Sequence, residues 1–413
     1  MCFFPVIAFC AEGSDAVSGE NSPLTLKDCY ELALKQSELI AIDSERIKEA
    51  EAHFLQAFGA LLPQISFSRS ETIRNSNFYP SYNRNFEQKF VFKQALFAGF
   101  KEFSGISGSQ FEKKQRENEK LRAEQLLFVD VSDAFYLLLE EREDIKTLEI
   151  ITNAFNNRIN ELNTRVDLGK SRISEVVSTQ TQLYSLQDQI ELVKSQELVA
   201  RELLEFLIAR PVGEVIESKL DFSLKPESEY LDKASSRTDV QAANFAWQVN
   251  QKNITIAKSG FLPTLNLEGD YFGHRSSAPT DSRWDSLLTI DVPIFEGTTT
   301  YGKVKEAISK AKESELLFKR SGRLASQDIH DAYVSAQAAF LRTNVLEKAL
   351  KSAEKNYDLQ IQDYKLSVVN NLDVLTAIQS LEDVRRNFNR VSYESKRFYW
   401  QLLSAAGEIS IDK

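Results

Sequence analysis

Two stretches of the chain share one layout, RVDLGKSRISEVVSTQTQL (165–183) and YKLSVVNNLDVLTAIQSL (364–381). Each contains a short polar turn between runs of helical periodicity. Three pairs of landmarks recur at an offset of about 200 residues: LFAG (96–99) and IFEG (294–297), GALLP (59–63) and GFLP (260–263), and Leu168 and Leu366. One period shared by separate landmarks indicates a tandem duplication of a single unit.

Long helices are predicted on both sides of each turn. Apolar residues recur at steps of three and four through residues 100–210 and again through 301–406. The chain has only 9 Pro and 15 Gly among its 413 residues, and the scarcity of these breakers favours long uninterrupted elements. Each repeat is therefore predicted to end in a long helical hairpin.

A pair of strands is predicted before each hairpin, at 63–97 and 263–296. In the first pair Ile65 and Phe67 alternate with small polar residues, and in the second Leu288, Ile290, Val292 and Ile294 do the same. Helices over 24–61 and about 238–259 precede the two pairs. No run of 18 apolar residues occurs, so crossing a membrane would require strands closed into a barrel. Four strands are too few to close alone, which predicts that several chains join.

The predicted organisation along the chain has six segments. They are a signal-peptide remnant (1–11), a flexible N-terminal segment (12–23), the first repeat (24–210), a connector (211–235), the second repeat (236–406) and a tail (407–413). The apolar start lacks a basic region, as a start codon assigned too late would explain. Lipid attachment at Cys10 is the alternative to cleavage near it.

Composition argues against several functions. The net charge of -10 is unsuited to nucleic acid, which requires a basic surface. The three histidines have no metal-ligand spacing, so no metal site is expected. Gly169-Lys170-Ser171 resembles the end of a phosphate-binding loop, but a helix precedes it where that motif needs a strand. No catalytic arrangement stands out, so the chain is predicted to be neither an enzyme nor a cofactor-binding protein.

Several segments together resemble the TolC-like outer-membrane efflux proteins. They are LTLKDCYELAL (24–34), ALLPQISF (60–67), KQALFAG (93–99), FLPTLNL (261–267), DVPIFEGTTTYG (291–302) and the two stretches quoted first. The resemblance implies a mainly α fold with a transmembrane β-barrel portion. Three chains would form a homotrimer with a 12-stranded barrel in outer-membrane lipid, continued by a long α-helical barrel in the periplasm.

The resemblance also implies a function and partners. Members of the family are exit ducts of tripartite efflux pumps or type I secretion systems. Their partners are a periplasmic adaptor protein and an inner-membrane transporter. A non-channel coiled-coil scaffold in the periplasm is the alternative function.

By the same resemblance, the two turns correspond to the family's periplasmic gate. Glu175, Tyr364 and Asp373 match gate positions of the family. Val369 stands where some members have an arginine that locks the closed state, and Lys170 or Arg172 could supply a substitute cation. A further set would form the tips on which the adaptor docks: Gly169, Ser367, Asn370 and Asn371.

Simpler interpretations exist for these residues. Gly, Asn and Ser permit tight turns, and charged residues in turns are usually hydrated. Tyr271 and Trp284, near predicted strand ends, could belong to an aromatic belt at a membrane interface or could pack inside the fold.

Overall fold

The computed structural model describes residues 23–76, 79–217, 223–275 and 281–409. The predicted signal-peptide remnant and Cys10 lie outside these residues. The first half contains α1 (Leu26–Gln36), α2 (Glu38–Gly59), β1 (Gln64–Ser76), β2 (Tyr79–Ala98), α3 (Lys101–Asp167) and α4 (Ile173–Ile208). The second half contains α5 (Glu227–Leu231), η1 (Ala234–Ser236), α6 (Thr238–Lys258), η2 (Ser259–Phe261), β3 (Thr264–Arg275), β4 (Trp284–Asp291), α7 (Thr299–Lys365) and α8 (Asn371–Ala406).

The order of elements confirms the internal duplication. Helix, two strands, very long helix and long helix occur twice, as α2–β1–β2–α3–α4 and α6–β3–β4–α7–α8. The matching helices have equal lengths, with 67 residues each in α3 and α7 and 36 each in α4 and α8. The prediction of a mainly α fold with four strands per chain is also confirmed. No helix among the described residues offers a stretch long and apolar enough to cross a membrane.

The prediction of one continuous helix over 24–61 is wrong, because the structure has two helices there, α1 and α2. Ser37 leaves the helical region with ψ 115°, and its Oγ accepts a hydrogen bond from the Ile40 amide at 3.4 Å. Serine competes for backbone hydrogen bonds in this way and favours a helix start over a helix interior. Ser37 therefore ends α1 and begins α2.

The strand boundaries also differ from the predicted ones. β1 and β2 have 13 and 20 residues, whereas β4 has 8 and ends at Asp291. Val292 and Ile294, predicted to continue the alternation, lie outside the strand. Pro293 between them has no amide hydrogen to donate to a neighbouring strand, which accounts for the early end.

Each strand pair leads into its long helix through the same backbone turn. Gly99 and Phe100 have φ of 67° and 66°, and the equivalent Gly297 and Thr298 have φ of 59° and 70°. A Cβ on Gly99 would approach the carbonyl oxygen of Ser259 to 2.9 Å. Glycine is needed at this position both for the left-handed conformation and for the close approach.

The chain divides into two compact units. The first, here called the turn unit, consists of Met1–Gln36, Val131–Asp221 and Ala353–Asn389, and it includes both hairpin turns. The second, the strand unit, consists of Ser37–Asp130, Phe222–Ser352 and Arg390–Lys413.

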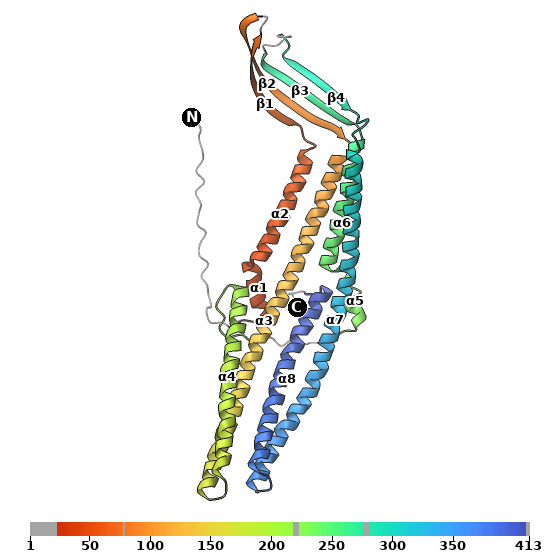
Figure 1. The fold of residues 1–413 in the computed structure, drawn as a ribbon. Helices are drawn as coiled ribbons and strands as arrows, with labels where there is room; N and C mark the ends of the chain where they lie inside the picture. The colour runs from red at the N-terminus through yellow and green to blue at the C-terminus, as the bar shows by residue number, and fades with distance from the viewer. Residues whose placement is uncertain (1–22, 77–78, 218–222, 276–280, 410–413) are drawn as a thin grey trace. The chain divides into compact units, whose positions relative to one another are not determined.

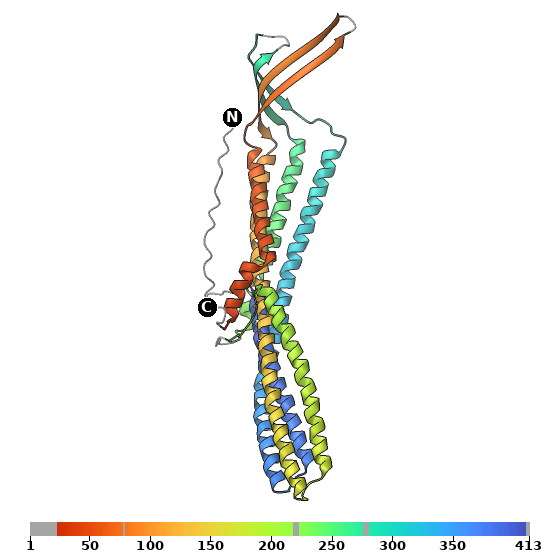
Figure 2. The same ribbon diagram turned by 90° about the vertical axis from the view of Figure 1, so that its left-hand side faces the viewer.

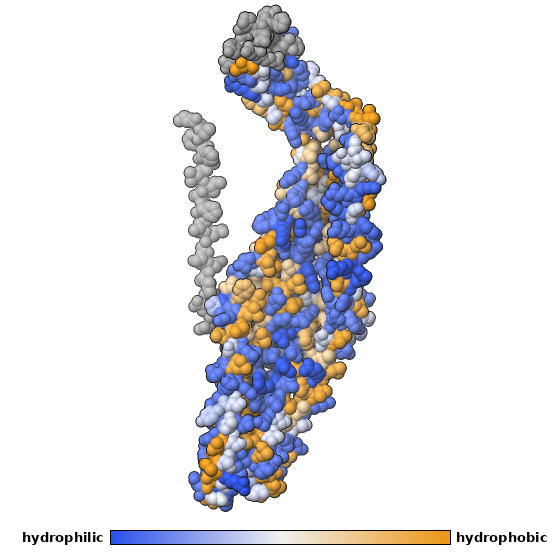
Figure 3. All heavy atoms as spheres, in the orientation of Figure 1, coloured by the Kyte–Doolittle hydropathy of each residue, from blue (hydrophilic) through white to orange (hydrophobic). Residues whose placement is uncertain are grey.

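In the strand unit all four strands form one antiparallel sheet in the order β1-β2-β3-β4. Among the described residues, those before Glu87 in β2 have no partner in β3, and Figure 2 shows the β1–β2 pair extending beyond the described parts of β3 and β4. Figure 3 shows hydrophobic residues gathered at the end of β4 and over the segment that follows it. There Ile294 and Phe295 are 95% and 86% exposed.

The helices of the strand unit form a row, α2–α3–α6–α7 (Figure 1). Lys113 of α3 lies 2.8 Å from Glu51 of α2. The rings of Phe111 in α3 and Phe245 in α6 have their centres 6.3 Å apart. Asn250 of α6 donates a hydrogen bond to Ser314 of α7 at 2.7 Å. α2 and α7 are the edges of this row, as β1 and β4 are the edges of the sheet.

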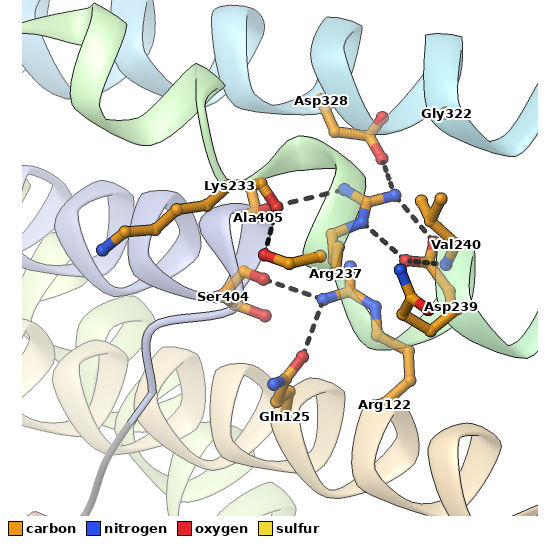
Figure 4. Close-up of polar contacts among 12 residues, drawn as sticks. Arg122, Gln125, Lys233, Arg237, Asp239, Val240, Gly322, Asp328, Ser404 and Ala405 are labelled. Atoms are coloured by element: carbon orange, nitrogen blue, oxygen red, sulfur yellow. Dashed lines mark hydrogen bonds and ion pairs between the residues drawn. The ribbon is translucent and has the colours of Figure 1, made fainter. Parts of the chain in front are cut away.

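A cluster of two arginines holds the carboxyl end of α8 in the strand unit (Figure 4). Arg122 donates to the carbonyl oxygen of Ser404 at 2.8 Å, and Arg237 donates to that of Ala405 at 3.3 Å. Arg237 also pairs with Asp239 at 2.7 Å and with Asp328 at 3.0 Å. The last carbonyls of a helix have no partner inside the helix, so these cations satisfy them and interact favourably with the helix dipole.

Candidate functional site

The two hairpin turns of the turn unit have the same hydrogen-bond pattern. Gly169 N donates to Val166 O at 2.9 Å and Lys170 N to Arg165 O at 2.8 Å. In the second repeat Ser367 N donates to Tyr364 O at 2.9 Å and Val368 N to Asp363 O at 2.9 Å. This pattern closes a helix with one left-handed residue, which is Gly169 (φ 70°) in one turn and Ser367 (φ 61°) in the other.

The helices next to these turns are joined by a buried group of side chains, here called the tip cluster. It consists of Arg158 and Arg165 from α3, Thr179 from α4, Tyr364 from α7 and Asn371 from α8. Arg158 Nε donates to Asn371 Oδ1 at 2.8 Å, and Asn371 Nδ2 donates to Thr179 Oγ1 at 3.3 Å. The Arg158 side chain is 1% exposed, so these hydrogen bonds are shielded from water.

Tyr364 is held between two guanidinium groups. That of Arg158 lies 3.5 Å from the centre of the tyrosine ring, and that of Arg165 lies 4.3 Å from it. Arg165 also donates to the Tyr364 carbonyl oxygen at 3.2 Å. Contacts of cations with aromatic faces contribute about 2 kcal/mol when both groups are removed from water. The tyrosine side chain therefore ties the α7–α8 turn to α3.

Glu161, next to the tip cluster, partly balances the positive charge of the two arginines. Glu161 lies 2.9 Å from Arg158 and 3.6 Å from Arg165. Arg158 Nη2 has no hydrogen-bond partner among the described atoms. A buried cation with incomplete hydrogen bonding is costly, which makes this junction sensitive to any change of partner.

More polar contacts join the two hairpins along the helices. Gln379 donates to Gln182 Oε1 at 2.9 Å, and Arg386 pairs with Asp144 at 3.1 Å. Asn389 donates to Thr147 Oγ1 at 3.0 Å. The association of the two hairpins in one chain therefore relies on polar side chains as well as on apolar ones.

The predicted gate residues have different surroundings. Tyr364 and Asn371 belong to the tip cluster. Glu175 accepts a hydrogen bond from Ser171 Oγ at 2.5 Å, and its carbonyl oxygen accepts one from Thr179 at 2.7 Å. Lys170 and Arg172 are exposed and form no ion pair within the described ranges.

Asp373 and Asn370 satisfy each other's backbone. Asn370 N donates to Asp373 Oδ2 at 3.0 Å, and Asp373 N donates to Asn370 Oδ1 at 3.2 Å. This reciprocal arrangement is a capping box at the start of α8. The Asp373 carboxylate therefore has a local structural role in addition to any predicted role at a gate.

Asn371 differs from the other residues predicted at the docking tips. Its side chain is buried, with 4% of the residue exposed, and both ends of its amide are hydrogen-bonded within the chain. Gly169, Ser367 and Asn370 are exposed at the turns, and docking of a partner there stays a prediction. Asn371 is thus part of the tip cluster and not of an exposed surface.

Arg158 and Arg165 are not among the gate and docking residues predicted from the sequence, although the sequence contains a signal for them. They continue the buried stripe of α3 at steps of three and four: Leu148, Ile151, Phe155, Arg158, Leu162 and Arg165. Two cations seven residues apart in an apolar stripe must have buried partners. Their partners, Tyr364 and Asn371, are about 200 residues away and cannot be read from spacing.

Comparison with known proteins identifies relatives of the chain. The family model described as outer membrane efflux protein matches residues 29–210 and 232–408. The outer membrane protein TolC of Vibrio cholerae is 23% identical, over 96% of this chain and 93% of the relative. The pyoverdine export outer membrane protein OpmQ of Pseudomonas putida is 22% identical, over 86% of this chain and 80% of the relative.

A solved structure shares the fold. The outer membrane protein VceC of Vibrio cholerae superposes with a TM-score of 0.82 at 20% identity, covering 92% of this chain and 96% of that chain. The relatives are outer-membrane proteins, and the family model matches most of both repeats. The resemblance seen in the sequence is thereby confirmed, and the chain belongs to the outer membrane efflux protein family.

Proposed function

We propose that the chain is the outer-membrane exit duct of a tripartite efflux pump or a type I secretion system. Three copies would form a homotrimer that passively conducts small molecules or proteins across the periplasm and outer membrane. A periplasmic adaptor protein and an inner-membrane transporter would deliver the cargo. Efflux is favoured by the relatives, since one of them is named for the export of pyoverdine.

The observation that carries this proposal is the pair of open edges in the strand unit. Among the described residues β1 pairs only with β2, and β4 pairs only with β3. Open strand edges cannot remain in lipid, because their backbone groups would lack partners. Pairing β4 of one copy with β1 of the next removes every edge, and three copies of four strands give a closed ring of twelve.

The tip cluster supports a gate in the turn unit. It joins the α7–α8 turn to α3 and α4 through the buried Arg158 and Tyr364. A passage that ends at these turns would widen when Tyr364 and Asn371 separate from Arg158. Glu175, Asp373, Lys170 and Arg172 would then supply the charges at the opening.

The exposed turns suit docking of a protein partner. Leu168, Leu366 and Val368 are 64%, 73% and 70% exposed, next to Gly169, Ser367 and Asn370. Exposed apolar side chains grouped at turns are typical of interaction sites. The adaptor would bind these exposed turns, whereas the buried Asn371 would act in the gate as part of the tip cluster.

Fractionation and conductance measurements test the function. We expect heat-resistant trimers in outer-membrane fractions and discrete conductance steps when these trimers are added to planar bilayers. Monomers that stay soluble after extraction without denaturant, with no conductance, would support the coiled-coil scaffold and overturn the duct.

Arg158→Ala tests the gate. We expect trimers of this variant to conduct more than the unmodified protein, because Asn371 and Tyr364 lose their shared partner. Lys355→Ala, which removes an exposed cation of α7 in the same unit but away from the turns, is the matched control and should leave the conductance nearly unchanged. Equal conductance of all three proteins would remove the tip cluster from the gate.

A further inference from the structure

The two faces of the sheet differ in chemistry. One face has exposed apolar and aromatic side chains, which are Ile65, Phe67, Phe90, Tyr271, Trp284, Leu288 and Ile290. Because these side chains are more than half exposed, packing inside the chain does not account for them. A closed barrel in lipid turns such side chains outward and its polar side chains toward the lumen. In the proposed ring the other face of the sheet therefore lines the lumen.

This other face, here called the lumen face, has hydroxyl and charged side chains. Strand β1 contributes Ser66, Ser68 and Ser70. The charged residues on it come from the other three strands and are Glu87, Lys89, Lys93, Glu268, Asp270, Arg275, Asp285 and Asp291. Side chains alternate between the faces along each strand. Arg275 lies opposite Glu87 on the lumen face, since the register shift next to Lys89 reverses the alternation in β3.

Each cation of the lumen face lies next to an acid of a neighbouring strand. The pairs are Lys89 with Asp270 at 2.5 Å, Lys93 with Glu268 at 3.4 Å, and Arg275 with Asp285 at 2.9 Å. Opposite charges this close together largely cancel at longer distances, because the two Coulomb energies have opposite signs. The cations of the lumen face therefore offer little attraction to an anion in the lumen.

Two carboxylates of the lumen face have no such partner. Glu87 and Asp291 form no ion pair within the described parts of the chain. Glu87 is opposite Arg275 in the register, but the Arg275 guanidinium pairs with Asp285. Five carboxylates and three cations leave an excess of two negative charges per chain on the described strands of this face.

The two unpaired carboxylates lie at opposite ends of β3. Asp291 is the register partner of Thr264, the first residue of β3, and Glu87 is the partner of Arg275, the last. Asp291 is exposed and borders a hollow of about 420 Å³ that is also lined by polar side chains, among them Gln64, Asn266 and Thr289. Water can therefore reach Asp291.

We infer that Asp291 and Glu87 are specificity-determining residues that favour cations over anions in the barrel lumen, an inference that rests on the proposed outer-membrane duct. In a ring of three copies each carboxylate occurs three times. Rings of acidic side chains are a common source of cation preference in channels. This preference is separate from any contribution of Asp373, which belongs to the turn unit.

Removing an acid and removing a cation should shift the selectivity in opposite directions. Asp291→Asn should lower the ratio of potassium to chloride permeability, and Glu87→Gln, at the other end of the face, should lower it independently. Lys93→Gln leaves Glu268 without its cation and should raise the ratio. Each change should be roughly twofold or more, as expected for one charge about 8 Å from a permeant ion in water.

Reversal potentials of single trimers in planar bilayers measure these ratios. A gradient of dilute potassium chloride is needed, because at about 1 M salt charges are screened within about 3 Å. Arg69→Gln is the matched control, since it removes a cation from the opposite face of the same sheet. It should leave the permeability ratio unchanged.

The outcomes separate this inference from the proposed duct. An unchanged ratio in Lys93→Gln or in both acid variants, or an equal change in Arg69→Gln, would overturn the role of the lumen face while conducting trimers still support the duct. Unmodified trimers without conductance would overturn the duct and this inference with it.

Discussion

At the scale of single residues, the two hairpin turns share a backbone hydrogen-bond pattern but differ in the residue that takes the left-handed conformation. Ser367 adopts the left-handed conformation that Gly169 adopts in the first repeat. This conformation costs a residue with a Cβ about 1–2 kcal/mol. The duplication predicts that both positions have the same backbone, but only the structure shows that serine accepts the strain.

Substitutions at Ser367 and at Gly169 should change the stability of the trimer in opposite directions. Ser367→Gly should raise the thermal denaturation midpoint of the trimer, because it relieves up to about 1 kcal/mol per chain. Gly169→Ala should lower the midpoint, and since a Cβ there would have nothing within 4 Å, strain alone would be responsible. Circular dichroism melts of the two variants check this. A lower midpoint for Ser367→Gly would contradict it.

Asp373 combines a charge with a capping role, and two substitutions separate them. Asp373→Asn keeps an oxygen that can accept from Asn370 N, so it should lower the cation preference in bilayers with little loss of stability. Asp373→Ala should lower the cation preference equally and also cost about 1 kcal/mol of helix stability. Reversal potentials in a salt gradient and thermal melts measure the two effects. Unchanged selectivity in both variants would place Asp373 away from the conduction path.

At the scale of elements, side chains set the boundaries that hydrophobic periodicity misses. The apolar steps of three and four continue past Ser37, and the alternation of β4 continues past Pro293. At Ser37 a side chain that accepts a backbone hydrogen bond sets the element boundary, and at Pro293 the missing amide hydrogen sets it. The long helices were predictable because their periodicity extends over many turns, while the cluster at the end of α8 was not, since Arg122 and Arg237 are distant in sequence.

The arginine cluster should be important for anchoring α8. Arg237→Ala removes a side chain that is 3% exposed and leaves Asp239 and the Ala405 carbonyl without it. Its partners Asp239 and Asp328 are 32% and 50% exposed, so the cost is expected to be below the value of about 3–5 kcal/mol for one member of a fully buried ion pair. We expect a strongly lowered denaturation midpoint, partly restored by Arg237→Lys. A midpoint close to that of the unmodified protein would show that the cluster contributes little.

The short helix α5 should be attached to α7 in a pH-dependent way. His330 Nδ1 lies 2.6 Å from Glu227, and this carboxylate raises the pKa of His330 above its usual value of 6.5. The stabilising contact is therefore fully present below about pH 6.5 and is lost as the pH rises through the raised pKa. Hydrogen exchange in α5, corrected for intrinsic rates, should be faster at pH 9 than at pH 6. His330→Gln should remove that difference, and an unchanged difference would exclude this contact as its cause.

At the scale of the whole molecule, the two edges of the helix row differ in their balance of charge. On α7 a surface hollow of about 730 Å³ is lined by Leu316 and Leu317, by the basic Lys319, Arg320 and Arg323, and by one acid, Glu313. On α2 the exposed residues include Leu39 and Ile42, the acidic Glu38, Glu45, Glu49 and Glu51, and the basic Arg46 and Lys48. A trimer closed through these edges would place acidic residues of one copy against basic residues of the next.

Charge reversal tests this arrangement. Arg320→Glu with Arg323→Glu should lower the temperature at which heat-resistant trimers dissociate on a gel. Adding Glu38→Lys and Glu45→Lys should restore part of the loss, because attraction between the edges returns. The α2 changes alone should also weaken the trimer. No rescue by the combination would show that the two edges do not meet.

The pairing of β2 with β3 has a consequence for the order of folding. β2 ends at Ala98 and β3 begins at Thr264, so the centre of the sheet joins segments separated by most of a repeat. Closing so long a loop costs entropy before any pairing compensates it. The inner edge of β2 therefore stays unpaired until β3 is available. An unpaired edge is prone to aggregate, so a holding factor bound to β2 in this interval would protect the nascent protein.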